Sequence, residues 1–287
     1  MAYENFIPTV WAEGIDRELE RLSVFAEDCN TQYEGAVKKK GDSVRILGVG
    51  KPTIKRITKD ARNNNIDDPE DVEDTSVVMQ INQIAYFNYM VGDIDKAQMV
   101  SGVREALSAE TSEGLADEVD RDISAKVADG NVKKLYSAAT KIVAGDAGTG
   151  EKNVLDALDE ALQLLYENDV KPNTYIVATV SPRFFTLFKK AYIKADTDNS
   201  EMLKHGKIAM YGNLTIKMSN NVLRSDDGKE DNIMIRTKRA IAFAKPLTHV
   251  EAYRPEKKFA DAVKGFVLFD SKVVRPKEII NLNVKYA

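Results

Sequence analysis

Residues 33–46 read YEGAVKKKGDSVRI and residues 76–91 read SVVMQINQIAYFNYMV, with a basic and then an acidic stretch between them. The two ends have the β-branched and aromatic content that is typical of strands. The outer half has little apolar material to pack against a body of its own. A monomeric enzyme has no need of such a segment. We therefore predict one long two-stranded arm that reaches to neighbouring copies of the chain.

The charges of this arm are separated into two blocks. The first stretch has five cations and one carboxylate, Asp60, and its net charge is +4. The second stretch has six carboxylates and a net charge of −6. Blocks of like charge are usually solvated. An exposed ion pair contributes only about 0–1 kcal/mol, but pairs repeated over a lattice add up and guide register. One set of residues is predicted to contact neighbouring subunits. It consists of Trp11, Lys51, Lys55, Arg56, Lys59, Arg62, Asp67, Asp68, Glu70, Asp71, Glu73 and Asp74.

Length and composition indicate a soluble globular protein. The chain has 287 residues, of which 43% are hydrophobic and 30% charged, enough for one large domain or two smaller ones. No apolar run is long enough to span a membrane, and the N-terminus has no secretion-signal pattern. The single cysteine, Cys29, fits synthesis in a reducing cytoplasm. A net charge of −4 argues against a whole-molecule grip on nucleic acid, although local contact stays open.

Two helical segments flank the arm in the sequence. Trp11–Phe25 has the spacing of an amphipathic helix, which docks either on its own core or on a partner. Residues 94–129 repeat apolar positions every fourth residue and predict a rod about 50 Å long if the helix is continuous. The alternative is two ordinary helices with a break near Gly114.

The C-terminal half predicts a compact mixture of helices and strands. A turn-rich link at 145–150 precedes a helix at 151–168 and a buried strand at 175–179. Ser181-Pro182 is typical of a helix start. Residues 206–285 consist of strand-like pieces separated by turns.

No residues for catalysis, cofactor or metal binding stand out. Gly145–Asn153 is close to a phosphate-binding loop, but its lysine is displaced by one position and its hydroxyl residue is missing. His205 and His249 have no second ligand at metal-binding spacing. Cys29 has no partner that would make it a nucleophile and is typical of a small buried residue. We predict that the chain is not an enzyme and has no cofactor.

The order of these segments resembles a known family, the major capsid (coat) proteins of tailed bacteriophages with the Hong Kong 97-like fold. The resemblance extends over nearly the whole chain. Each motif is weak alone, and their order and spacing make the match specific. The matching stretches are Trp11, Tyr33–Gly35 with Gly41–Val44, Val91–Gln98, Tyr253–Asp261 with Val263–Gly265, and Val274–Lys277.

The resemblance implies an α+β fold with five parts. These are an N-arm at 1–32, an extended E-loop hairpin at 33–92, a peripheral domain with the spine helix at 93–149, an axial domain at 150–245, and a return to the peripheral domain at 246–287.

The resemblance also implies the function. Subunits of this family assemble into pentons and hexons of an icosahedral head that encloses double-stranded DNA, so the chain belongs to the virion and is assembled in the bacterial host cytoplasm. Its partners are itself, a portal, DNA through weak unspecific contact, and no membrane. The early start of the arm predicts a separate scaffolding protein. No lysine or asparagine is singled out for a covalent cross-link.

Three other functions stay open at this point. An encapsulin-type nanocompartment shell shares the fold and encloses an enzyme cargo instead of DNA. An enzyme with a mobile lid at 35–90 would be a monomer or small oligomer with turnover. A tail or decoration protein of a phage is the third possibility.

Overall fold

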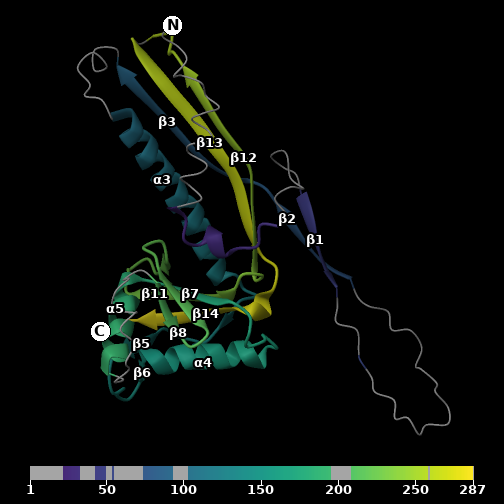
Figure 1. Ribbon diagram of the computed structural model, residues 1–287, viewed down its shortest axis with the longest axis vertical. Coiled ribbons are helices and arrows are strands. Elements are labelled where there is room, and N and C mark those ends of the chain that lie inside the picture. The colour runs from purple at the N-terminus through teal and green to yellow at the C-terminus, as the bar shows by residue number, and fades with distance from the viewer. Residues whose placement is uncertain are drawn as a thin grey trace, which may run out of the picture.

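The computed structural model describes residues 22–32, 43–49, 54, 74–92, 103–194, 208–257 and 259–286. These residues form two regions (Figure 1). A long narrow sheet with one helix along it makes the upper region, and a broader sheet with two helices makes the lower region. The predicted α+β fold class is confirmed.

The long sheet has three antiparallel strands in the order β12-β13-β3. They are β3 (Gln83–Gly92), β12 (Ile241–Tyr253) and β13 (Ala260–Val273). The register of β12 on β13 shifts between Ala244 and Leu247. Pro246 lies in this interval and has no N–H to donate, which favours a bulge at that place. Alternation along β3 sends Ala85, Phe87 and Tyr89 toward the core of this region.

Helix α3 (Val103–Ala125) covers that face of the long sheet and is continuous through Gly114. The alternative of a break near Gly114 is therefore wrong. Leu115, Val119 and Ile123 are buried at the predicted spacing of four residues. The helix tightens into η4 (Lys126–Ala128) and ends before Asp129. Residues 93–102, which include the expected start of the rod, lie outside the described part.

The lower region is a nine-stranded mixed sheet. Its main path is β6-β5-β14-β11-β7-β9-β8, with β10 paired to β11 and β4 to β14. Its strands are β4 (Lys133–Lys134), β5 (Thr140–Val143), β6 (Glu151–Asn153), β7 (Ile176–Val180), β8 (Ile208–Tyr211), β9 (Leu214–Met218), β10 (Leu223–Arg224), β11 (Glu230–Thr237) and β14 (Ile279–Lys285).

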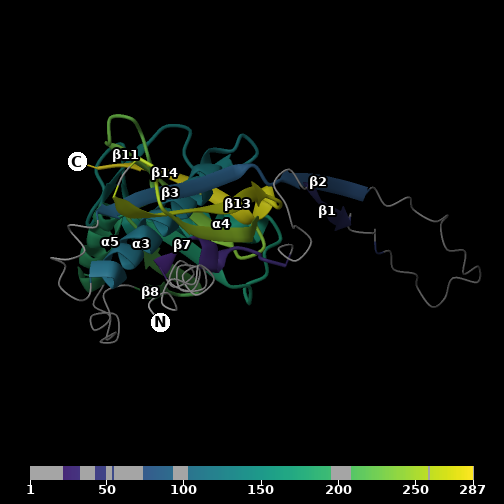
Figure 2. The same cartoon turned by 90° about the horizontal axis from the view of Figure 1, so that it is seen from above.

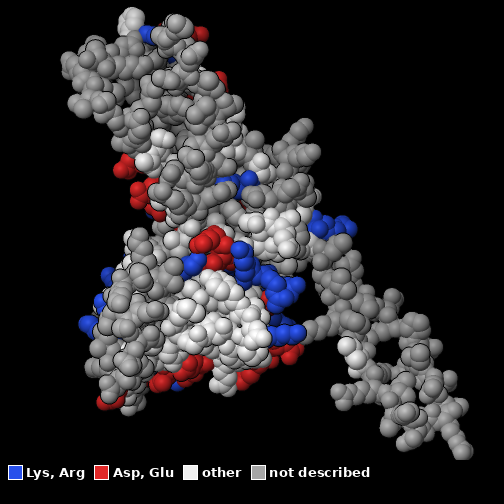
Figure 3. All heavy atoms as spheres, in the orientation of Figure 1, with Lys and Arg blue, Asp and Glu red and all other residues white. Residues whose placement is uncertain are grey.

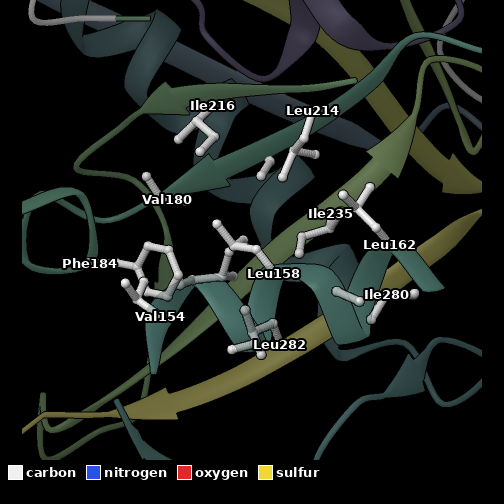
Figure 4. Packing of buried hydrophobic residues seen from close by; sticks show 14 of the residues in the cluster. Val154, Leu158, Leu162, Val180, Phe184, Leu214, Ile216, Ile235, Ile280 and Leu282 are labelled. Carbon is white, nitrogen blue, oxygen red and sulfur yellow. The ribbon is translucent and has the colours of Figure 1, made fainter. Parts of the chain in front are cut away.

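Two helices complete the lower core, α4 (Val154–Glu167) and α5 (Pro182–Lys194). Figure 4 shows Leu158 and Leu162 of α4 beside Phe184 of α5 and the strand residues Ile235 and Leu282. The first three residues of the expected helix 151–168 form strand β6 instead. The helix begins at Val154 because the Asn153 side chain accepts a hydrogen bond from the Leu155 N–H at 2.9 Å.

The nine-stranded sheet takes strands from both sides of the domain limits expected at 150 and 245. Strand β5 comes from the segment assigned to the spine-helix domain. Strand β14 comes from the C-terminal segment and lies beside β11 in the middle of the lower sheet. Only β12 and β13 of the C-terminal segment belong to the long sheet.

Candidate assembly surfaces

The arm has a root that is fixed to its own subunit. Strand β1 (Ser43–Val49) pairs antiparallel with β2 (Asp74–Gln80). One face of this pair is buried against β12 and β13, in a cluster made of Val44, Ile46, Met79, Ile81, Ala242, Ala244 and Leu268. Figures 1 and 2 show β1 and β2 standing out from the side of the molecule. The described strands are therefore anchored at one end and are not folded flat against the body.

The strand-like run that follows the acidic stretch changes its partner in the middle. Only Ile81 and Asn82 separate β2 from β3. Before them the chain pairs with β1, and after them it pairs with β13. The Asn82 N–H donates to Asp270 Oδ2 at 3.3 Å, and Ile81 is fully buried. The hairpin is thus a direct extension of the long sheet.

The predicted contact residues fall almost entirely outside the described residues. Asp74 is the first residue of β2 and is the register partner of Val49. The other eleven positions are Trp11, Lys51, Lys55, Arg56, Lys59, Arg62, Asp67, Asp68, Glu70, Asp71 and Glu73. Their contact with a neighbouring subunit stays a prediction.

A row of apolar side chains lies on the exposed face of β3. Ile84, Tyr86 and Met90 are 39%, 77% and 51% exposed, on the face opposite α3. Their register partners on β13 are Leu268, Phe266 and Ala262. Among the described strands β3 lies at the edge of the long sheet, so this row forms an apolar margin of that sheet. The sequence run showed the aromatic residues but not which face each one occupies.

A buried polar clamp fixes the segment before the arm. The Asp120 carboxylate on α3 accepts hydrogen bonds from the Ser23 hydroxyl, from the Val24 N–H at 2.8 Å and from the Phe25 N–H at 3.1 Å. Burial raises the pKa of Asp120, and these hydrogen bonds offset that rise only in part. The clamp binds this segment to the spine of the long region.

Two cations of the lower sheet hold the same segment from the other side. Arg236, which is fully buried, donates from Nη1 to the Asp28 carbonyl and from Nη2 to the Phe25 carbonyl, the latter at 2.8 Å. Lys217 Nζ lies 2.8 Å from Asp28 Oδ2 and 2.7 Å from Glu27 Oε2. Burial alone would lower the pKa of Lys217, but its hydrogen bonds to these carboxylates raise it.

The segment therefore joins both regions of the subunit. It includes η2 (Ala26–Asp28) and continues to Asn30, which pairs with β12: the Asn30 N–H donates to the Ile241 carbonyl at 2.9 Å. Of the two docking modes expected for Trp11–Phe25, the described end lies on its own core, since Phe25 is 1% exposed. Sequence reasoning missed this clamp. The one signal for it was an arginine at the end of the apolar run 233–235.

Several groups that a catalytic interpretation would use make contacts within the described part of the subunit. In the loop 145–153, Lys152 pairs with Glu160 and Glu151 pairs with Lys141 at 2.7 Å. Burial raises the pKa of the Cys29 thiol, which donates to the Phe25 carbonyl at 3.3 Å. The ring of His249 lies 5.6 Å from that of Phe266, and His205 is outside the described residues.

The described residues contain neither a candidate metal site nor a candidate membrane span. In the described ranges no group of three His, Cys, Asp or Glu residues could hold a metal ion. Among the same residues no helix has the length and apolar content needed to cross a bilayer.

The described part of the chain combines a long sheet with a spine helix, a broad mixed sheet and a projecting hairpin. No family model and no curated protein matches the sequence, but solved structures match most of it. A structure of Mycobacterium phage Che8 has 25% identity and a TM-score of 0.67, covering 91% of this chain and 90% of that one. The capsid of cyanophage P-SCSP1u has 15% identity and a TM-score of 0.66, with 92% and 88% covered.

A virus-like particle from Pyrococcus furiosus matches at 12% identity and a TM-score of 0.57, with 94% of this chain and 96% of that one covered. The chain has the Hong Kong 97-like fold of the major capsid proteins of tailed bacteriophages, and the resemblance drawn from the sequence is confirmed. The cyanophage structure is a capsid and the Pyrococcus structure is a virus-like particle, which agrees with the predicted lack of enzymatic activity. The encapsulin alternative is not better supported than a phage capsid.

Proposed function

We propose that this chain is the major capsid protein of a tailed phage or prophage, a structural subunit that self-assembles into the icosahedral head around double-stranded DNA. The observation that carries the proposal is the match of a single capsid fold over nine-tenths of the chain. A hairpin whose root is buried on its own subunit and whose strands stand out from the body supports it, because an arm of this kind can bury its remaining surface on a neighbour.

The parts of the subunit have distinct roles in this proposal. The segment at 1–32 is the N-arm and 33–92 is the E-loop hairpin. Helix α3 and the long sheet form the peripheral domain. The nine-stranded sheet with α4 and α5 forms the axial domain, which packs around the five-fold and six-fold axes. Because β5 and β14 lie in that sheet, we extend the axial domain to residues 140–143 and 279–285.

The main partner of the chain is other copies of itself, in hexamers and pentamers. A separate scaffolding protein and a portal complete the head, which is assembled in the cytoplasm of the bacterial host. A net charge of −4 favours weak, unspecific contact with the packaged DNA.

The test is the assembly state of the purified full-length chain, measured by size-exclusion chromatography and negative-stain electron microscopy. We expect rings or closed shells. Replacing residues 50–73 by a short Gly-Ser turn keeps the root residues Val44, Ile46 and Met79 in place. This variant is expected to fold and to form capsomers that do not close. A monomer with catalytic turnover, unaffected by the deletion, contradicts the proposal.

A second variant examines the basic stretch at 51–62. Changing Lys55, Arg56 and Lys59 to Glu is expected to reduce shell closure more than it reduces the thermal stability of the subunit. The matched control changes the exposed Lys133, Lys134 and Lys171 to Glu. A normal particle yield from the arm variant would show that this basic stretch does not hold neighbouring subunits together.

A further inference from the structure

The two helices of the lower region carry charges of opposite sign. Helix α4 contains four carboxylates and no Lys or Arg, whereas α5 contains four cations and no Asp or Glu. The carboxylates are Asp156, Asp159, Glu160 and Glu167, and the cations are Arg183, Lys189, Lys190 and Lys194.

The acidic charges of α4 point to solvent. The helix buries the face that includes Val154, Leu158 and Leu165, so the positions between them lie on the outside. Asp156, Asp159 and Glu167 are exposed there. Figure 3 shows the resulting red side chains along the lower margin of the molecule, where α4 lies in Figure 1. Among the described side chains, Glu160 is the one carboxylate of α4 with an ion pair, to Lys152.

The basic charges of α5 also point to solvent. Phe184 and Phe188 bury the inner face of this helix, and Arg183, Lys189 and Lys190 are exposed. The Arg183 guanidinium donates to the Gly228 carbonyl at 3.1 Å. No ion pair between described side chains joins α5 to α4, although both helices pack on the same core.

Helix stability alone does not explain this separation. The helix dipole favours acidic groups in the first turn and basic groups in the last turn. Asp156 follows this preference. Glu167 in the last turn of α4 and Arg183 in the first turn of α5 oppose it. Each helix carries charges of one sign near both of its ends. This is the pattern expected of a surface that meets a partner.

We propose that the acidic face of α4 on one subunit binds the basic face of α5 on the next copy within a capsomer. This inference rests on the proposed shell function. A ring is built from heterologous contacts, in which each subunit offers one surface to the preceding copy and a different surface to the following one. Two unlike surfaces of opposite charge on one body meet that requirement, and charge complementarity also suppresses the wrong pairing of like faces.

The experiment is a charge exchange on the full chain. The α4 variant carries Asp156→Lys, Asp159→Lys and Glu167→Lys, and the α5 variant carries Arg183→Glu, Lys189→Glu and Lys190→Glu, which reverses the sign of the net charge of each helix. Each variant alone is expected to lose capsomers at least about tenfold, as measured by mass photometry at low salt. The six changes together in one chain are expected to restore capsomers with both odd and even numbers of subunits. An equimolar mixture of the two variants restores rings with an even number of subunits only, because unlike subunits must alternate.

The outcomes separate this inference from the shell function. A wild-type chain that forms no capsomers overturns both. Wild-type capsomers with no loss in either variant overturn the α4–α5 contact alone. A loss that the chain with all six changes fails to restore overturns it as well. Normal capsomers with reduced DNA retention in the α5 variant assign α5 to nucleic acid instead.

Two controls accompany the exchange. The pair Glu118→Lys and Arg121→Glu on the exposed face of α3 is expected to leave the yield unchanged. If the Lys variants of α4 lower the melting temperature, Asp156→Asn with Glu167→Gln replaces them, and it is expected to lower the yield by a smaller factor. An unchanged yield from this neutral variant overturns the contact.

Discussion

The ring of Phe87 on β3 lies over Gly265, its register partner on β13. A Cβ atom at position 265 would be 2.6 Å from Phe87 Cζ and 2.8 Å from the His249 carbonyl oxygen. The glycine thus leaves the space that the ring occupies, and this contact favours one register of the two strands. That register sets the point at which the chain passes from β2 into the long sheet.

Gly265→Ala is expected to destabilise the subunit by about 1–3 kcal/mol, because either the Phe87 ring or the β12 backbone has to move. Urea denaturation followed by far-ultraviolet circular dichroism measures the loss. Gly114→Ala on α3 is the matched control, since a Cβ there meets nothing within 4 Å. The control is expected to stabilise the protein by about 0.5–1 kcal/mol. Equal stability of the two variants would show that the Phe87 contact has no energetic effect.

Arg236→Lys is expected to lower the free energy of unfolding by about 1.5–3 kcal/mol. A lysine has no planar fork with which to reach the Asp28 and Phe25 carbonyls together, so at least one of them loses its donor. Arg239→Lys is the comparison, because Arg239 is exposed, and its effect is expected within about 0.5 kcal/mol. Similar losses from both variants would argue against the buried clamp.

The pH dependence of stability reports on Asp120. Its pKa is raised above the ordinary 3.8 in the folded protein, so the folded state binds the proton more tightly than the unfolded state does. Stability from this group is therefore present below pH 3.8 and decreases as the pH rises through the raised pKa. Denaturation curves of wild type and Asp120→Asn between pH 3.5 and 7 test this. The advantage of wild type over the variant should shrink with rising pH, and a constant difference would contradict the raised pKa.

Tyr86→Ser with Met90→Ser is expected to reduce capsomer or shell yield while changing the stability of the subunit by less than about 0.5 kcal/mol. Both side chains are more than half exposed, so burial within their own subunit contributes little to their role. Electron microscopy and thermal melting are the two readouts. Tyr253→Ser on β12 serves as a control on another strand of this sheet. Full particle yield from the double variant would exclude the apolar margin of β3 from assembly.

The order of segments was accessible from the sequence because the long helix and the strand runs have strong periodicity. Leu115, Val119 and Ile123 predicted the buried face of α3 correctly. The same method could not show that one strand run divides at Ile81 and Asn82, since both halves have the same apolar and aromatic content. The same method could not show which of the two sheets β14 joins, because Ile279–Leu282 would fit the core of either region.

The clamp around residues 23–30 lay beyond sequence reasoning for a different reason. Asp120 and Arg236 are ordinary charged residues in the sequence, and only tertiary packing makes them buried partners of backbone groups. The charges of the arm predict contact between subunits. This prediction concerns residues 51–73 and is left for experiment to test.

The two-residue connection at Ile81 and Asn82 has a mechanical consequence. A neighbour that pulls on the hairpin loads β2 along its length, and the load enters β3 in the same direction. It then acts as shear on ten residue pairs, from Gln83–Phe269 to Gly92–Ala260. Backbone hydrogen bonds loaded in shear resist together, whereas bonds that are peeled break one after another. The subunit therefore resists force best in the direction in which its neighbours would pull on the hairpin.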